Sequence, residues 1–125
     1  MLERLLKVIG DYEIIEKTVP TASTLTFLDL EIRMKEQRVY LNNKHIPLNQ
    51  REFMVLCHLT SHPKWVFSKK DIYRAVWNEE PVNYENTVMC CISQLRKKIE
   101  PDPRHPKYIH TVRGVGYKFE PLSEE

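Results

Sequence analysis

The most distinctive chemistry of this sequence lies near its C-terminal end, where cationic side chains are concentrated in residues 86–119. This stretch holds seven Lys and Arg residues against one Glu and one Asp, which gives a formal charge of +5. The whole 125-residue chain carries only +2, so the remainder sums to −3. A cationic segment on a mildly acidic body is typical of a surface that binds a polyanion.

A helix is predicted inside this stretch, because apolar residues recur there at steps of four, three and four. The residues of this inner face are Val88, Ile92, Leu95 and Ile99. The opposite side collects small, polar and cationic residues, namely Thr87, Cys90, Cys91, Ser93, Gln94, Lys97 and Lys98. Such a helix fits the major groove of duplex DNA. A solvated surface helix is the alternative, since lysines are also favoured near helix C-termini.

The side chains of this helix offer both base-reading and phosphate-binding groups. Gln94 can pair bidentately with adenine, and Cys90 and Cys91 are small and apolar enough to lie against a thymine methyl group. The cationic residues suited to phosphates are Arg96, Lys97 and Lys98.

A β-hairpin is predicted after the helix, with strand-like segments 108–112 and 117–121 around Arg113-Gly114-Val115-Gly116. Gly114 and Gly116 permit a tight turn and a close approach to a phosphate or a groove floor. Arg113 at the tip suits a narrow minor groove. A nucleotide-binding loop is excluded, because Gly-x-Gly has no third glycine here and a strand follows it.

Other elements must position this helix and hairpin. Four short segments rich in β-branched and aliphatic residues predict a small antiparallel sheet: 24–27, 30–34, 38–41 and 44–48. A first helix begins after Asn49, where Glu52 completes the spacing of a capping box, and it ends before Pro63. Ser68 caps a second helix.

The second helix is expected to bury a stripe of Ile72, Ala75 and Val76, to which Tyr73 and Trp77 add bulk. A loop over residues 78–85 then leads to the cationic helix. Its polar and acidic residues include Asn78, Glu79, Glu80 and Glu85. This negative charge would suit a basic partner surface but not DNA.

Several other functions are disfavoured. No nucleophile–base pair, carboxylate dyad or phosphate loop is evident, so we expect neither an enzyme nor a cofactor. His58 and His62 are four residues apart but lack an obvious third ligand, so no metal site is expected. Cys90 and Cys91 could form a redox sensor, although small helix residues near a groove are the simpler interpretation. Three cysteines without C-x-x-C favour a reducing compartment, here the cytoplasm.

Three segments are predicted along the chain. Residues 1–23 form a leader helix and a linker, residues 24–121 the main domain, and residues 122–125 a tail. No apolar run has the length of a membrane span, so no membrane partner is expected.

Four sequence motifs closely resemble the OmpR/PhoB-type winged-helix effector domain of bacterial response regulators. They are L-N-Q-R-E-F-M-V-L, V-F-S-K-K-D-I with A-V-W, N-T-V-M-C-C-I-S-Q-L-R-K-K-I-E-P and I-H-T-V-R-G-V-G-Y-K-F. The resemblance implies an α+β winged helix-turn-helix with a four-stranded N-terminal antiparallel sheet, three helices and a C-terminal hairpin wing. It also implies transcription regulation in a two-component phosphorelay, with head-to-tail dimers on double-stranded DNA.

The resemblance also assigns roles to individual positions of this chain. It implies DNA contacts on the third helix from Asn86, Thr87, Cys90, Cys91, Ser93, Gln94 and Arg96. It places Arg113 in the minor groove and Thr111 against the DNA backbone, and the wing set is Thr111, Arg113, Gly114, Gly116 and Tyr117. It matches the acidic loop to a transactivation loop, which in activators touches RNA polymerase.

The sequence departs from the family pattern at three positions of the third helix. Met89, Cys91 and Gln94 stand where an acidic residue, a histidine and a second arginine are common. Without a cation at Gln94, we expect weaker phosphate binding, a flatter salt dependence and an unusual site preference.

Three questions follow from the resemblance. The chain lacks a receiver domain, so it is either the C-terminal part of a response regulator or a stand-alone regulator, and we expect the former. The alternative to DNA binding is a winged helix that serves as a protein-interaction module. RNA binding is less favoured, because the basic face has no evident aromatic platform.

Overall fold

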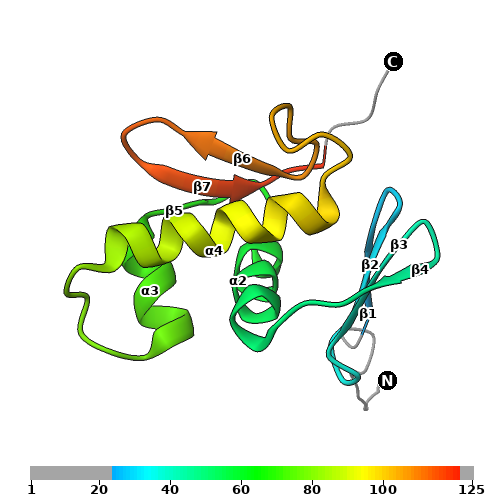
Figure 1. Ribbon diagram of the computed structural model, residues 1–125, viewed down its shortest axis with the longest axis horizontal. Coiled ribbons are helices and arrows are strands. Elements are labelled where there is room, and N and C mark those ends of the chain that lie inside the picture. The colour runs from blue at the N-terminus through cyan, green and yellow to red at the C-terminus, as the bar shows by residue number, and fades with distance from the viewer. Residues whose placement is uncertain (1–23, 122–125) are drawn as a thin grey trace, which may run out of the picture.

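A four-stranded antiparallel sheet opens the part of the chain that the computed structural model describes, residues 24–121 (Figure 1). Its strands follow one another in space as in sequence: β1 (Thr24–Phe27), β2 (Leu30–Arg33), β3 (Arg38–Leu41) and β4 (Lys44–Ile46). Asn42 and Asn43 both have positive φ, as the tight turn between β3 and β4 requires. The predicted leader helix and linker, residues 1–23, and the tail, residues 122–125, lie outside the described residues.

Three helices follow the sheet: α2 (Gln50–Ser61), α3 (Lys69–Trp77) and α4 (Tyr84–Ile99). The predicted capping box of α2 is present, since Asn49 accepts from the Glu52 backbone N–H and Glu52 accepts from the Asn49 N–H. The Ser68 hydroxyl caps α3 by accepting from the Asp71 N–H. The predicted stripe of α3 was wrong in one residue, because Ala75 is exposed. Ile72 and Val76 are buried as predicted, and so is Tyr73, which was expected to add bulk beside them.

The third of these helices, α4, begins earlier than the sequence predicted. It starts at Tyr84, so the connecting loop spans residues 78–83 and Glu85 lies in the first helical turn. Asn83 precedes the helix in the left-handed conformation and makes no side-chain capping bond, so the usual start signal is missing. A carboxylate in the first turn interacts favourably with the helix dipole.

The C-terminal hairpin consists of β6 (Ile109–Val112) and β7 (Gly116–Phe119), and it lies along α4 (Figure 1). A third strand, β5 (Val66–Phe67), pairs with β7 and was not predicted. Only Gly114 adopts a positive φ at the turn. Gly116 is needed for another reason than the one predicted: a Cβ there would collide with the carbonyl oxygen of Phe67.

One apolar core joins these elements, with the inner faces of α2, α3 and α4 at its centre. The edge-to-face contact between Phe27 of β1 and Phe119 of β7, at 4.8 Å between ring centroids, connects the N-terminal sheet to the base of the hairpin. Because the three helices and the hairpin share this core, it fixes how α4 and the hairpin lie relative to each other.

Within residues 24–121, no helix is long and apolar enough to cross a membrane.

Candidate nucleic-acid interface

The side of α4 opposite the core is a row of exposed, mostly uncharged side chains. We call it the outer face of α4, and its residues are Asn86, Thr87, Cys90, Ser93, Gln94 and Lys97. All six were predicted as interface residues, and the structure places them on one continuous surface of the helix. This surface presents amide, hydroxyl and thiol groups with a single cation near its end.

Cys91 was predicted for the same surface but lies off it. Its side chain is half-buried and packs against the core, and burial raises the pKa of its thiol to about 11. At neutral pH this thiol is therefore protonated and a poor nucleophile. A redox pair with the exposed Cys90 is correspondingly disfavoured.

Lys98 was also predicted to bind phosphate, but the structure holds it in an ion pair with α2. Its Nζ lies 2.7 Å from Oε1 of Glu52, whose side chain is only 3% exposed. The same oxygen accepts the N-cap bond from the Asn49 backbone N–H, at 3.0 Å. Lys98 therefore joins the C-terminal half of α4 to the start of α2.

Arg96 connects α4 to the hairpin. Its Nε and Nη2 donate to the carbonyl oxygen of Ile109 at 3.3 Å and 3.1 Å, and Nη2 also donates to Oγ1 of Thr111 at 2.8 Å. The guanidinium lies over the ring of Tyr117, 5.5 Å from its centroid. Burial lowers the pKa of Arg96, although an arginine remains charged at neutral pH.

The tip of the hairpin stands free in solvent. Arg113, Gly114 and Val115 are exposed, and the Val115 N–H donates to the Val112 carbonyl at 2.9 Å to close the turn. Thr111 is exposed on β6, as its predicted role requires. Tyr117, predicted as a wing contact, is only 6% exposed, and burial raises its pKa.

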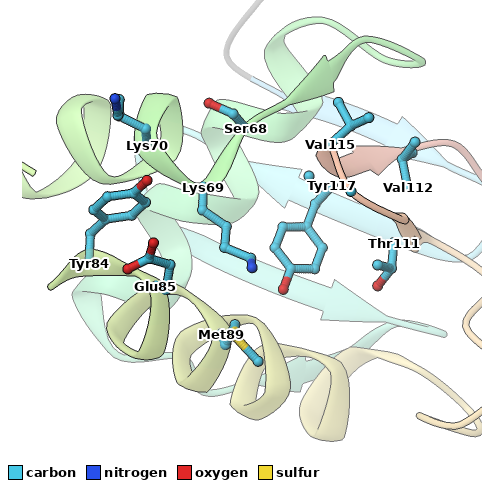
Figure 2. Close-up of a pocket in the computed structure, with 12 residues that line it drawn as sticks. Ser68, Lys69, Lys70, Tyr84, Glu85, Met89, Thr111, Val112, Val115 and Tyr117 are labelled. Atoms are coloured by element: carbon cyan, nitrogen blue, oxygen red, sulfur yellow. The ribbon is translucent and has the colours of Figure 1, made fainter.

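A groove of about 580 Å³ separates the wing from the N-terminal half of α4 (Figure 2). The wing contributes Thr111 and Tyr117, α4 contributes Met89, and the start of α3 contributes Lys69 and Lys70. Figure 2 shows the Lys69 side chain reaching into the space between Tyr117 and α4. The two lysines were missed from the sequence, although an N-cap serine followed by two lysines is a signal for an anion at a helix N-terminus.

The acidic loop is partly anchored. The Tyr73 hydroxyl donates to Oε1 of Glu79 at 2.9 Å, and the Tyr73 ring stacks on Trp77 at 5.2 Å. Glu80 and Val82 remain exposed, and 69% of the Val82 surface is accessible to solvent. Asn78, also predicted in this set, is the left-handed C-cap residue of α3, so its role is at least partly structural.

Comparison with known proteins agrees with this architecture. The family model described as "Transcriptional regulatory protein, C terminal" matches residues 43–119. The chain belongs to this family. Its predicted resemblance to OmpR/PhoB-type winged-helix domains and the predicted fold are both confirmed.

Members of this family and solved structures align over most of the chain. The Bacillus subtilis uncharacterised transcriptional regulatory protein YcbL is 43% identical over 90 residues, which are 72% of this chain and 40% of that protein. The Thermotoga maritima response regulator DrrB, an OmpR/PhoB homologue, superposes with a TM-score of 0.73 at 33% identity, covering 78% of this chain and 44% of that one. The Klebsiella pneumoniae RstA DNA-binding domain, in complex with the RstA box, superposes with a TM-score of 0.74 at 27% identity. The match covers 79% of this chain and 98% of the RstA domain. The chain thus spans about two fifths of the length of its curated relative YcbL.

Within this winged-helix domain, the two histidines considered as metal ligands have structural surroundings. His58 packs against Phe67, and His62 stacks on Trp65 at 4.0 Å between centroids. Burial lowers the pKa of His58. Among the described residues, no three His, Cys, Asp or Glu side chains are grouped so that they could hold a metal ion.

Proposed function

We propose that this chain binds duplex DNA in a sequence-specific manner, as the effector domain of a transcriptional response regulator. The observation that carries the proposal is the pairing of the outer face of α4 with an arginine-tipped wing across a groove that contains lysines. The outer face of α4 enters the major groove and Arg113 enters the adjacent minor groove. The family membership and the DNA-bound RstA structure support this proposal.

Base readout falls to the uncharged groups of the outer face. Gln94 recognises adenine through its amide, and Cys90 lies against a thymine methyl group. Asn86, Thr87 and Ser93 serve as further polar contacts. The function is binding rather than catalysis, and it is exercised in the cytoplasm, where bacterial DNA is found.

Lys97 is the one cation on this face, because Arg96 and Lys98 make intramolecular contacts. Phosphate binding by α4 is therefore modest, and the lysines at the start of α3, Lys69 and Lys70, supplement it. We expect a shallower salt dependence than the number of cations in residues 86–119 would give.

The first test is selection of binding sites from a randomised duplex library at moderate salt. Enrichment of a short motif in tandem, about 10–11 bp centre to centre, would support specific binding by head-to-tail dimers. Weak binding that salt erases, with no enriched motif, would contradict the proposal. That result, combined with retained partner binding, would favour the protein-interaction module.

Arg113→Ala tests the wing. It removes the minor-groove cation, so we expect weaker binding and loss of preference for A/T-rich flanks. Arg104→Ala is a matched control, because Arg104 is also exposed but lies in the α4–β6 loop at the other end of the hairpin (Figure 1). Equal losses in the two variants would contradict the proposed role of the wing.

The acidic loop is proposed to contact RNA polymerase when the regulator activates transcription. Glu80 and Val82 carry this contact, because Glu79 is engaged by Tyr73 and Glu85 belongs to the first turn of α4. Glu80→Ala should leave DNA affinity unchanged and reduce activated transcription in vitro. Unchanged activation would argue against this surface.

A further inference from the structure

We propose that this chain binds a soft monovalent metal ion, Cu(I) or its analogue Ag(I), in a groove beside α2, with Cys57 and Met34 as its two sulfur ligands. Of the described residues, those that line this groove come from α2, α3 and the turn after β2, and none comes from α4 or the hairpin. The site is therefore separate from the candidate nucleic-acid interface, and the inference does not depend on DNA binding.

Two sulfur atoms already meet in this groove. Cys57 of α2 donates its thiol hydrogen to the thioether of Met34, and Sγ lies 3.6 Å from Sδ. With metal–sulfur bonds of about 2.3 Å, the length of a zinc–thiolate bond, two sulfurs at this separation subtend about 100° at a shared ion. This angle is close to that of a tetrahedral site. Both side chains can therefore hold one ion with little movement of the backbone.

Further donors line the same groove, which has a volume of about 390 Å³. Met54 lies one turn before Cys57 on the same side of α2, and its unbranched thioether side chain can adapt to an ion. His58 also lines the groove, and its Nε2 is buried without a hydrogen-bond partner among the described residues. Thiolate, thioether and imidazole ligands favour Cu(I) over magnesium or calcium, which bind oxygen ligands.

The charge of the lining favours a monovalent ion. No Asp, Glu, Lys or Arg is among the described residues that line this groove. Burial raises the pKa of the Cys57 thiol to about 11, so the thiol is protonated at neutral pH when no ion is bound. A bound cation replaces this proton, which passes to solvent. The thiolate and a monovalent ion are then neutral together, whereas a divalent ion would leave an uncompensated positive charge in an uncharged, partly buried groove.

The bound ion would connect the N-terminal sheet to the helices. Met34 follows the last residue of β2, and Cys57 lies 23 positions further along the chain in α2. The sequence gave no sign of this pair, because neither helical nor strand periodicity relates residues so far apart. Metal ligands of the usual His, Cys, Asp and Glu types also miss it, since two of the donors are methionines.

The first experiment follows the methionine methyl signals of the full 125-residue chain by NMR. The chain carries Cys90→Ser, which removes the exposed thiol as a competing ligand, and its methionine methyl groups are isotope-labelled. Silver nitrate, a redox-inert source of Ag(I), is added in chloride-free buffer up to one equivalent. The methyl signals of Met34 and Met54 should shift, whereas the signal of the exposed Met89 should not.

The second experiment measures affinity for Cu(I) by competition with bicinchoninate under anaerobic, reducing conditions. Cys57→Ser and Met34→Leu, each in the Cys90→Ser chain, remove one proposed ligand. Each should weaken Cu(I) binding by more than the roughly 10–100-fold that loss of an outer-shell partner costs. Met89→Leu, a change of the same type at an exposed methionine of α4, is the matched control and should leave the affinity unchanged.

The outcomes are distinct. If one equivalent of Ag(I) does not shift the Met34 methyl signal, or if Met34→Leu binds Cu(I) as tightly as Met89→Leu, the two sulfurs only pack together and the inference is overturned. A Met34 shift that persists in Cys57→Ser would also overturn it. An equal shift with zinc sulfate would overturn the assignment to a soft monovalent ion. Because Met34→Leu nearly conserves side-chain volume, it tests the site even if Cys57→Ser fails to fold.

Discussion

The ion pair between Lys98 and Glu52 should respond asymmetrically to removal of its two partners. The Glu52 side chain is 3% exposed and the Lys98 side chain 36%. Lys98→Met leaves a buried carboxylate with the Asn49 backbone N–H as its remaining partner. Glu52→Gln instead frees an ammonium group that reaches water, while the amide oxygen can still accept from Asn49. Breaking the pair from the lysine side should therefore be the more destabilising change.

The magnitudes follow from this difference in burial. Removing one partner of a fully buried pair costs about 3–5 kcal/mol. Because Lys98 is partly exposed, we expect about 2–3 kcal/mol for Lys98→Met and about 1 kcal/mol for Glu52→Gln. In a domain of this size, about 2–3 kcal/mol corresponds to a Tm lower by roughly 8–24 °C. In the Glu52→Gln background, Lys98→Met should cost less than about 1 kcal/mol, since no carboxylate is then stranded.

Urea unfolding, followed by circular dichroism, measures the free energy of unfolding of the unaltered chain, the two single variants and the double variant, which together form a double-mutant cycle. Lys97→Met is the matched control, because Lys97 is exposed and makes no ion pair among the described residues; its effect should stay within about 0.5 kcal/mol. If Lys98→Met were as mild as Lys97→Met, or milder than Glu52→Gln, the reasoning from burial would be refuted.

Three further predictions concern other buried or constrained groups. Glu100→Gln should cost about 2–3 kcal/mol in denaturant unfolding, because the buried carboxylate accepts from three successive backbone N–H groups of residues 107–109; a cost near zero would contradict its role in holding this loop. Iodoacetamide at pH 8 should alkylate the exposed Cys90 well before Cys91, because a thiol whose pKa is raised to about 11 is almost entirely protonated there. Equal rates by peptide mass spectrometry would place Cys91 at the surface. Gly116→Ala should destabilise the domain more than Gly114→Ala. A Cβ at position 116 collides with the β5 backbone, whereas alanine at position 114 has free space and only an unfavourable positive φ. The reverse order in thermal unfolding would refute the close approach of β7 to the Phe67 backbone.

Local patterns in the sequence predicted most of the elements. The N-terminal strands follow from alternation and from the Asn42-Asn43 turn, and the starts of α2 and α3 follow from the caps at Asn49 and Ser68. These signals are short-range, so a sequence displays them directly. The early start of α4 was missed because Asn83 uses backbone conformation rather than a side-chain cap.

The candidate interface was predictable as a helix face but not as a set of free cations. Helical periodicity identified the outer face of α4. Periodicity does not show that Arg96 contacts residues 13 and 15 positions away, or that Lys98 contacts Glu52, 46 positions away. For the same reason the two-residue strand β5 gave no signal, because its pairing partner lies about 50 residues further along the chain.

That short strand has a consequence for the order in which the chain folds. Val66 and Phe67 sit between α2 and α3, yet they pair with Lys118 and Tyr117. Closing this loop of about 50 residues carries an entropic cost that local pairing does not, so the three-stranded sheet forms only once the helices bring its ends together. The β6–β7 hairpin can form locally, but it is locked in place by the segment between the helices. Amide protons of β7 that face β5 should therefore exchange with the same opening free energy as those of the helical core.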